Sequence, residues 1–253
     1  MSVHYILWSV QMIRFVRGFL VCMVFAIFGI CSLLLSFLCL PIGGMFWRGE
    51  QKREKFSHMI HKFWHVYTQF FVILGLIKVE KVNVKSVRGK IIVATHPTFI
   101  DILILIGIYD NSLCIAKKEL LNNIFLKNII KNVYIPNNVE LDEFKQICTE
   151  ALNDGYNVII FPTGTRTIEG EELKIHKGAS AVQIASGADI LPIKMDCDYP
   201  FLQKGKPIYD AGKRVITYTI TQLEPIKLSN FNEKSEIKLR NAICEKIKFD
   251  FTH

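Results

Sequence analysis

Charge is absent from one long stretch near the N-terminus, because no Asp, Glu, Lys or Arg occurs in residues 18–47. A helix that spans a bilayer needs about 20 apolar residues. Residues 18–40 supply that length before Pro41 and the Gly43–Gly44 pair, where we expect the helix to break. A cleavable signal peptide has a shorter apolar core of about 7–15 residues that ends in small side chains. The run is too long for that class and predicts a hydrophobic membrane helix.

The basic residues on either side of this run leave two interpretations open. More of them follow the run than precede it: Arg48, Lys52, Arg53 and Lys55 against Arg14 and Arg17. Since the more basic flank stays in the cytoplasm, this asymmetry places the rest of the chain on the cytoplasmic side of the inner membrane. Alternatively, a helix pair dips into one leaflet, with the aromatic-rich segment 56–77 lying in the interface. Both interpretations make residues 1–77 an anchor and residues 78–253 a separate domain.

Closely spaced cysteine pairs and dense basic runs are also absent. The seven cysteines show no CxxC spacing, which argues against a disulfide framework and predicts buried, reduced thiols. The histidines and cysteines lack metal-ligand spacing, so we expect no metal. The net charge of +8 in a chain that is half hydrophobic indicates a membrane surface or an anionic ligand. Nucleic acid is not favoured, because the Lys and Arg residues are scattered.

Strands and helices alternate beyond residue 77. β-branched runs predict strands, and apolar residues spaced three or four apart predict helices. The expected strands cover 77–84, 90–95, 113–116, 133–136, 157–162, 189–195 and 214–221, and the expected helices cover 97–109, 118–132, 141–154, 177–187 and 233–249. This alternation predicts an α/β domain with a mostly parallel or mixed sheet flanked by helices. Pro192 inside a strand implies an edge or a strand start and is interpreted as structural.

His96 and Asp101 lie between two apolar runs in IIVATHPTFIDILILIG. Five helical steps put two side chains on different faces of a helix, so the pair meets only if His96 precedes the helix and Asp101 lies in its first turn. The carboxylate would then fix the imidazole tautomer and favour the imidazolium formed on proton uptake. The alternative is a structural role for both residues, with the histidine in a turn and the aspartate at a helix start.

Two further segments carry candidate binding residues. In NVIIFPTGTRTIEG a strand opens into a polar loop, in which Gly164 permits a tight turn, Thr163 and Thr165 offer hydrogen bonds, and Arg166 can hold a phosphate. Lys177 lies at an expected helix start, which suits an anion. An ordinary turn with a surface arginine, and a solvated lysine, are the alternatives for these segments.

Taken together, the three segments resemble the lysophosphatidic acid acyltransferase (PlsC-like) family of glycerolipid acyltransferases over residues 78–225. The first family motif matches His96 and Asp101. The third matches Phe161, Pro162, Gly164, Thr165 and Arg166, and the fourth matches Leu191, Pro192 and Ile193. An apolar N-terminal segment is usual in that family.

The resemblance implies direct acyl transfer without a cofactor. His96, oriented by Asp101, would deprotonate an acceptor hydroxyl as it attacks an acyl-carrier-protein or coenzyme A thioester. The expected partners are this thioester and membrane lipids, and the expected product is phosphatidic acid. Pro162 and Pro192 would be structural.

Two departures from the family pattern concern the acceptor. Thr163 replaces the usual glutamate of the third motif, and no arginine occurs between Asn132 and Thr165, where the second motif normally supplies one for the acceptor phosphate. Arg166, Lys177, Lys118 or Lys131 would have to supply the charge. An amino-acid lipid or a polyene-type lipid is therefore an alternative acceptor, and a catalytically idle lipid-binding protein is a further alternative.

Overall fold

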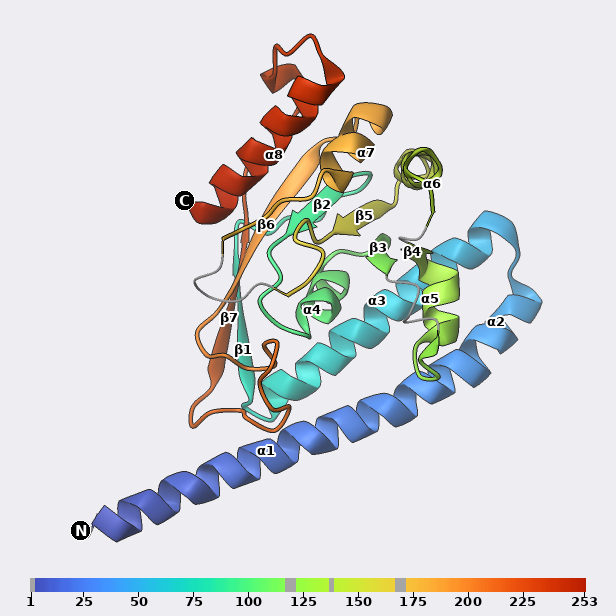
Figure 1. Ribbon diagram of the computed structural model, residues 1–253. Helices are drawn as coiled ribbons and strands as arrows, with labels where there is room; N and C mark the ends of the chain where they lie inside the picture. Colours follow the sequence, from blue (N-terminus) through green and yellow to red (C-terminus); the bar gives the residue numbers. More distant parts are fainter. Residues whose placement is uncertain (1–2, 117–121, 137–138, 167–171) are drawn as a thin grey trace.

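The computed structural model describes residues 3–116, 122–136, 139–166 and 172–253, and in these residues a seven-stranded sheet lies between two layers of helices (Figure 1). The strands are β1 (Ile77–Val82), β2 (Ile91–Ala94), β3 (Ser112–Ala116), β4 (Tyr134–Pro136), β5 (Asn157–Ile160), β6 (Ile190–Cys197) and β7 (Ile216–Gln222). Their order across the sheet is β1-β7-β6-β2-β5-β3-β4. Every neighbouring pair is parallel except β6 and β7, so the predicted mixed sheet is confirmed.

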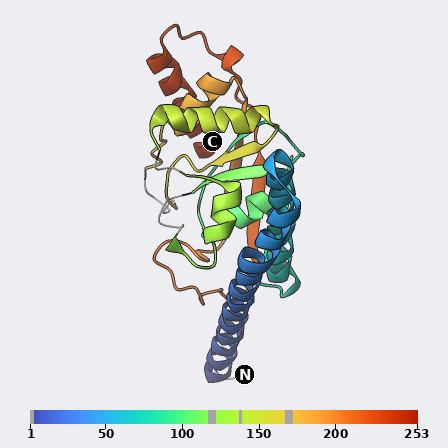
Figure 2. The same cartoon turned by 90° about the vertical axis from the view of Figure 1, so that its right-hand side faces the viewer.

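The helices cover both faces of this sheet. They are α1 (Val3–Leu34), a π-helical stretch (Leu35–Cys39), α2 (Leu40–Phe46), α3 (Gly49–Ile73), α4 (Asp101–Ile108), α5 (Lys127–Val133), α6 (Leu141–Asn153), α7 (Gly178–Ser186), a 3-10 turn (Leu228–Asn230) and α8 (Glu236–Thr252). The α7 and α8 helices pack against each other and against β2 and β6, whereas α3 packs along α4 on the other side. The α1 helix runs along the outside of α3, and its N-terminal end projects beyond the rest of the molecule (Figure 2).

The central strands explain where the functional loops emerge. The β2 and β5 strands are buried along their whole length, as expected for parallel strands covered on both faces. Ile91 pairs with Val158 and Val93 with Ile160, so both strands end at the same edge of the sheet. Ligands of open α/β sheets bind outside this carboxyl edge. The segments after β2 and β5, which contain the predicted site residues, therefore start side by side.

The expected break at Pro41 is wrong, because the chain stays helical through Phe46. Pro41 lies in the first turn of α2, directly after the π-helical stretch, where the local change in hydrogen bonding accommodates a residue without an N–H. Gly43 is required there for packing rather than for a break. A Cβ on Gly43 would come within 2.9 Å of the Phe56 ring on α3.

Two predicted helices begin later than expected. The α4 helix starts at Asp101 rather than near Pro97, because the Asp101 carboxylate bonds to the amide of Thr98 and holds the preceding residues in a turn. The α5 helix starts at Lys127; the side chain of Asn123 accepts a hydrogen bond from the amide of Phe125 and so stabilises a turn instead. Residues 117–121, where the predicted helix would begin, lie outside the described residues.

The N-terminal helices pack on the domain through one face only. The buried residues of α3 recur at helical spacing, and Phe28 of α1 stacks against Trp64 of α3 at 5.3 Å between ring centroids. The opposite face of α1 leaves large apolar side chains exposed, including Phe15 and Phe19. The division at residues 77 and 78 stays a prediction, as does an interfacial position for 56–77.

The burial of the cysteines differs in part from expectation. All seven cysteines are free, but Cys22 and Cys39 are exposed on the apolar N-terminal helices rather than buried. They are exposed because this helical run presents one face to the outside.

The strand of Pro192, β6, is central rather than at an edge; Pro192 is near its start, beside Val93 of β2. The missing N–H of Pro192 is tolerated because Pro192 lies just beyond Ile193–Gln222, the last residue pair of the β6–β7 ladder.

Candidate active site

His96 and Asp101 meet in the way that their spacing requires. His96 lies in the loop after β2, Asp101 is the first residue of α4, and Nδ1 of His96 is 3.0 Å from Oδ2 of Asp101. The Asp101 side chain is fully buried and that of His96 is 17% exposed. Because Nδ1–H donates to the carboxylate, Nε2 keeps its lone pair and is the nitrogen available as a base.

Three donors hold the buried Asp101 carboxylate. Besides His96, the amide of Thr98 donates at 2.7 Å, and the Thr98 hydroxyl donates to the other carboxylate oxygen. The Tyr218 hydroxyl on β7 donates in turn to Oγ1 of Thr98 at 3.1 Å. Burial raises the pKa of Tyr218 well above its usual value, so this phenol remains protonated and can only act as a neutral partner. The chain from Tyr218 through Thr98 to Asp101 fixes the carboxylate against the histidine.

Strand β6 fixes the backbone just before the histidine. The amide of Thr95 donates to the carbonyl of Ile193, and Oγ1 of Thr95 lies 3.0 Å from the carbonyl oxygen of Met195 and 2.7 Å from its amide. Thr95 is thereby tied to β6 by side chain and backbone. The segment LPIKM therefore helps to position His96, although Thr95 and Met195 are 100 residues apart in the sequence.

The loop after β5 lies over the histidine ring. Phe161 stacks on His96 with 4.2 Å between ring centroids and 22° between planes. The amide of Gly164 donates to the carbonyl of Phe161 to close a turn, in which Gly164 has a φ of 66°, a value that favours glycine. Thr163 uses its hydroxyl within the loop, donating to the carbonyl of Thr165 at 2.7 Å. Buried Pro162 accepts a backbone hydrogen bond from His176, which fixes the loop to the chain before α7.

Arg166 is partly committed to the protein itself. Its guanidinium donates to the carbonyl of Leu202 at 3.0 Å, and the same carbonyl accepts from the amide of Phe99. A guanidinium carries five N–H groups, so this bond leaves donors for an anion. Arg166 is therefore a partly buried cation near His96 whose position is set by the segment after β6.

The other predicted cations are not gathered at the site. Lys177 is exposed before α7 and does not line the cavity described below, and Lys131 is exposed on α5. Lys118 and residues 137–138 lie outside the described part of the chain. Among the described residues, no three His, Cys, Asp or Glu side chains are placed to hold a metal ion, and metal independence stays a prediction.

A cavity of about 480 Å³ extends from His96 into the apolar interior. Its polar end contains His96, Gly164, Thr165 and Arg166, from the loops after β2 and β5. The remaining wall is apolar and is built by Phe28, Trp64, Phe99, Ile102, Leu103, Cys114, Ile115, Leu126, Ile129, Ile130, Tyr134, Ile160 and Phe161, with Asn123. Burial raises the pKa of Cys114 and of Tyr134, so both stay uncharged at neutral pH. The cavity thus joins one basic polar end to a neutral, apolar interior.

Several residues that build this site were missed by sequence reasoning. Phe28 and Trp64 were assigned to the anchor, yet both line the cavity beside His96. Thr98 and Tyr218 hold Asp101 but belong to no motif. Thr98 could have been found from the sequence, because it lies between His96 and Asp101, three residues before Asp101. Tyr218 and Phe28 give no such signal, because only the tertiary fold brings β7 and α1 to the site.

Comparisons with known proteins identify relatives of this chain. The model of the Acyltransferase family matches residues 76–196. The 1-acyl-sn-glycerol-3-phosphate acyltransferase of Bacillus subtilis is 32% identical over 145 residues, 55% of this chain and 70% of that protein. A chloroplastic 1-acyl-sn-glycerol-3-phosphate acyltransferase of Arabidopsis thaliana is 26% identical over 195 residues, 71% of this chain and 51% of that protein. This chain thus spans about half the length of the plant relative.

The fold has a solved counterpart. The crystal structure of the 1-acyl-sn-glycerophosphate acyltransferase PlsC from Thermotoga maritima superposes with a TM-score of 0.70 and 22% identity, covering 94% of this chain and 97% of that one. At this identity the likeness establishes the fold. The identity to the Bacillus protein over most of its length, together with the family match, confirms the resemblance indicated by the motifs: this chain belongs to the 1-acyl-sn-glycerol-3-phosphate acyltransferase family.

Proposed function

We propose that this protein transfers a fatty acyl group from an acyl thioester to the free hydroxyl of a lysophospholipid, with 1-acylglycerol-3-phosphate as acceptor and phosphatidic acid as product. One observation carries the proposal: a His96–Asp101 pair faces a cavity that is basic at one end and apolar in the interior. This arrangement suits a phosphate-bearing glycerol head and a long acyl chain. The names of the relatives point to the same acceptor.

The reaction uses His96 as a general base. Nε2 takes the proton of the acceptor hydroxyl while the oxygen forms a bond to the thioester carbon. The C–S bond then breaks, the ester remains, and the leaving thiolate receives the proton from the imidazolium. Asp101 stabilises this imidazolium through Nδ1. Because a thiolate is a competent leaving group, no acyl-enzyme and no cofactor are required.

The acyl chain would occupy the apolar part of the cavity. Its wall consists of neutral side chains, so burial of a hydrocarbon chain there removes apolar surface from water without burying a charge. The thioester of an acyl-carrier protein or of coenzyme A would then reach His96 from the polar end. Arg166 is the cation we assign to the acceptor phosphate, because it lines that end and keeps free donors.

The N-terminal helices would bind one leaflet of the inner membrane from its cytoplasmic side. Within the described part of the chain, one helical run, Trp8–Phe46, is long and apolar enough to cross a membrane. Yet residues in its middle, such as Val21 and Val24, are buried against the domain. Crossing the bilayer would pull the attached domain into the lipid. An orientation along the surface, with the exposed apolar face in the lipid, avoids this conflict.

Thiol release tests the catalytic proposal. Purified protein in neutral detergent should release free thiol from an acyl thioester when 1-acylglycerol-3-phosphate is added, with phosphatidic acid as the lipid product. His96→Ala should lower this rate by about a hundredfold or more, because general base catalysis contributes roughly 10²–10⁴-fold. Asp101→Asn should also lower it. Turnover of His96→Ala at the wild-type rate would contradict the mechanism.

A different acceptor is the alternative that a specific observation favours. The Thr163 hydroxyl donates to the carbonyl of Thr165 inside the loop, and the Arg166 guanidinium donates to the carbonyl of Leu202. The phosphate grip is therefore weaker than a pair of free arginines would provide. If thiol is released with an amino-acid lipid or a polyene-type lipid and not with 1-acylglycerol-3-phosphate, the acyl transfer stands and the acceptor changes. If no acceptor gives thiol release, the protein is a lipid-binding member of the family.

A further inference from the structure

The segment between β6 and β7 forms a second surface beside the apolar N-terminal helix. The chain leaves the sheet after Cys197, and residues 203–215 contact α1 and lead back to β7; Figure 1 shows the segment in orange next to α1. Arg17 of α1 donates to the carbonyl of Ala211 at 3.0 Å, and Arg14 is 3.4 Å from Asp210. At Gly18 the approach is so close that a Cβ would lie 2.7 Å from the carbonyl oxygen of Tyr209. These contacts fix the segment, here called the basic loop, against α1.

The basic loop combines free positive charge with exposed apolar surface. Lys204, Lys206 and Lys213 are exposed, and the described residues offer none of them an ion-pair partner, whereas Arg214 pairs with Asp198. Ile208 is 44% exposed and Tyr209 is 61% exposed in the same loop. Tyrosine is enriched at membrane interfaces, where its ring is buried at the level of the headgroups and its hydroxyl stays in water.

The neighbouring face of α1 indicates what this loop contacts. Phe15 and Phe19 remain exposed within one turn of Gly18, which touches the loop, and Met12 and Trp8 are exposed further toward the N-terminus of α1. An acidic protein partner would be attracted by the lysines but would gain nothing from this adjacent apolar face. An anionic bilayer satisfies both, because lipid tails take up the apolar side chains and headgroups attract the lysines.

We propose that residues 203–215 are a lipid-docking loop that binds anionic headgroups beside α1 and makes membrane attachment selective for anionic leaflets. This inference rests on the proposed membrane function of the N-terminal helices and adds a second contact of different chemistry. The loop also begins next to the site, because Leu202 accepts hydrogen bonds from Arg166 and from Phe99. Docking would therefore hold the polar end of the cavity close to the headgroup layer that contains an anionic acceptor.

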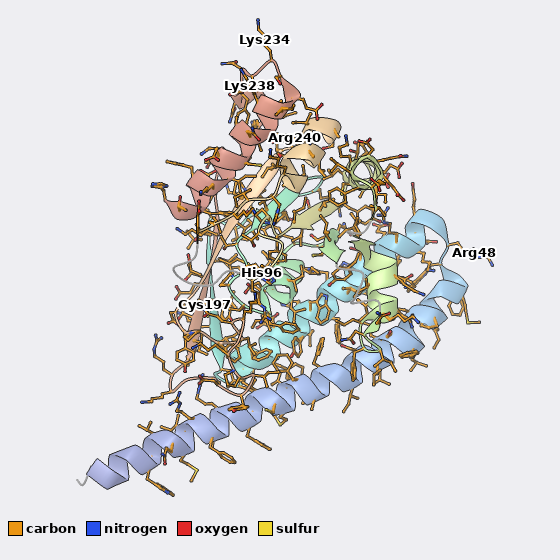
Figure 3. All side chains as sticks on the ribbon, in the orientation of Figure 1. Arg48, His96, Cys197, Lys234, Lys238 and Arg240 are labelled. Atoms are coloured by element: carbon orange, nitrogen blue, oxygen red, sulfur yellow. The ribbon has the colours of Figure 1, made fainter. Side chains whose placement is uncertain are left out.

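Vesicle binding tests the proposal with a charge-matched control. The full-length protein is sedimented with vesicles of phosphatidylcholine alone and with vesicles that also contain phosphatidylglycerol. Lys204→Ala/Lys206→Ala removes two charges from the loop, whereas Lys234→Ala/Lys238→Ala removes two exposed charges at the start of α8, at the end of the molecule away from α1 (Figure 3). Both variants have the same net charge, so a general electrostatic effect would weaken them equally.

The loop variant should bind anionic vesicles roughly ten- to thirtyfold more weakly than wild type, because a lysine near an anionic surface contributes about 1 kcal/mol. It should bind neutral vesicles as wild type does, and the α8 variant should match wild type on both. Equal loss in the two variants, or no loss in the loop variant, overturns the proposal. A loop variant that keeps its vesicle binding but loses affinity for acyl-carrier protein overturns it in favour of a protein partner.

The acyltransferase assay separates this proposal from the proposed function. In neutral detergent, where no anionic bilayer is present, the loop variant should release thiol at the wild-type rate. His96→Ala should lose thiol release and still bind anionic vesicles. A wild-type protein that binds neither kind of vesicle would contradict the membrane function itself and with it the docking loop.

Discussion

At the scale of single residues, the site depends on a buried carboxylate whose direct donors, His96 and Thr98, lie in one segment, with further support from Tyr218 on β7. Asp101 is fully buried and receives hydrogen bonds from His96 and twice from Thr98, and Thr98 receives one from Tyr218. These donors offset the loss of hydration that burial imposes on the carboxylate. Tyr218 does not touch the reacting atoms and is a positioning residue, since it acts through Thr98 on Asp101.

Tyr218→Phe should lower kcat by about three- to tenfold with little change in KM, because one buried hydrogen bond contributes about 0.5–1.5 kcal/mol. The matched control is Tyr109→Phe, which removes another buried hydroxyl, bonded to Gln222 at 3.1 Å and away from the His96–Asp101 pair. Both variants should lose a similar amount of thermal stability. If the control loses kcat equally, the effect of Tyr218 is only structural.

At the scale of elements, α4 carries Asp101 and is fixed by α3 at its other end. Nδ1 of His61 is 2.7 Å from the carbonyl oxygen of Ile106, and Nδ1 of His65 is 3.1 Å from that of Gly107. These imidazoles donate to carbonyls that the end of a helix leaves without partners. The two helices approach so closely that a Cβ on Gly107 would lie 3.0 Å from Cα of His65.

Gly107→Ala should destabilise the protein by about 1–3 kcal/mol, because the extra methyl group meets backbone that cannot rotate away. The control is Gly44→Ala in α2, where a Cβ would meet atoms no closer than 3.7 Å. That change should leave stability unchanged or raise it by about 0.4–1 kcal/mol, since alanine restricts the unfolded chain. Thermal unfolding in detergent measures both. A neutral Gly107→Ala would show that α3 and α4 can separate at no penalty.

At the scale of the whole molecule, α1 combines an exposed apolar outer face with an inner face that forms part of the cavity wall. Its outer face is exposed and apolar, while Phe28 on its inner face lines the cavity and contacts Trp64. In the proposed function, a single helix therefore separates the lipid from the acyl chain. A long acyl chain would pass from one apolar environment into another beside this helix.

Phe28→Ala should enlarge the cavity and shift the preferred acyl thioester toward longer or branched chains, with a loss of stability of about 1–3 kcal/mol for a half-buried ring. Phe19→Ala removes an equal ring from the outer face of α1, where Phe19 is 62% exposed, and should leave chain preference unchanged. Turnover with a series of acyl thioesters of increasing length gives the comparison. Identical preferences in wild type and Phe28→Ala would place the acyl chain elsewhere.

Local sequence predicted most of the elements, because their periodicities are strong. The buried strands IIVA and NVII and the helix from Leu141 to Asn153 agree with the expected ranges to within a few residues. The predictions failed where a side chain competes with the backbone for hydrogen bonds, as Asp101 does before α4 and Asn123 does before α5. They failed again at Pro41, because a π-helical stretch accommodates the proline.

The sequence by itself determined the family, the motif residues and the meeting of His96 with Asp101, because all of these depend on residue type and short spacing. Only the tertiary structure decided what surrounds them. Strand β7 brings Tyr218 to Thr98, β6 ties down Thr95, and α1 supplies Phe28 to the cavity. The IIVATHPTFID segment places the proposed base beside its partner, but only packing among distant elements makes the largely apolar cavity in which that base would work on a lipid.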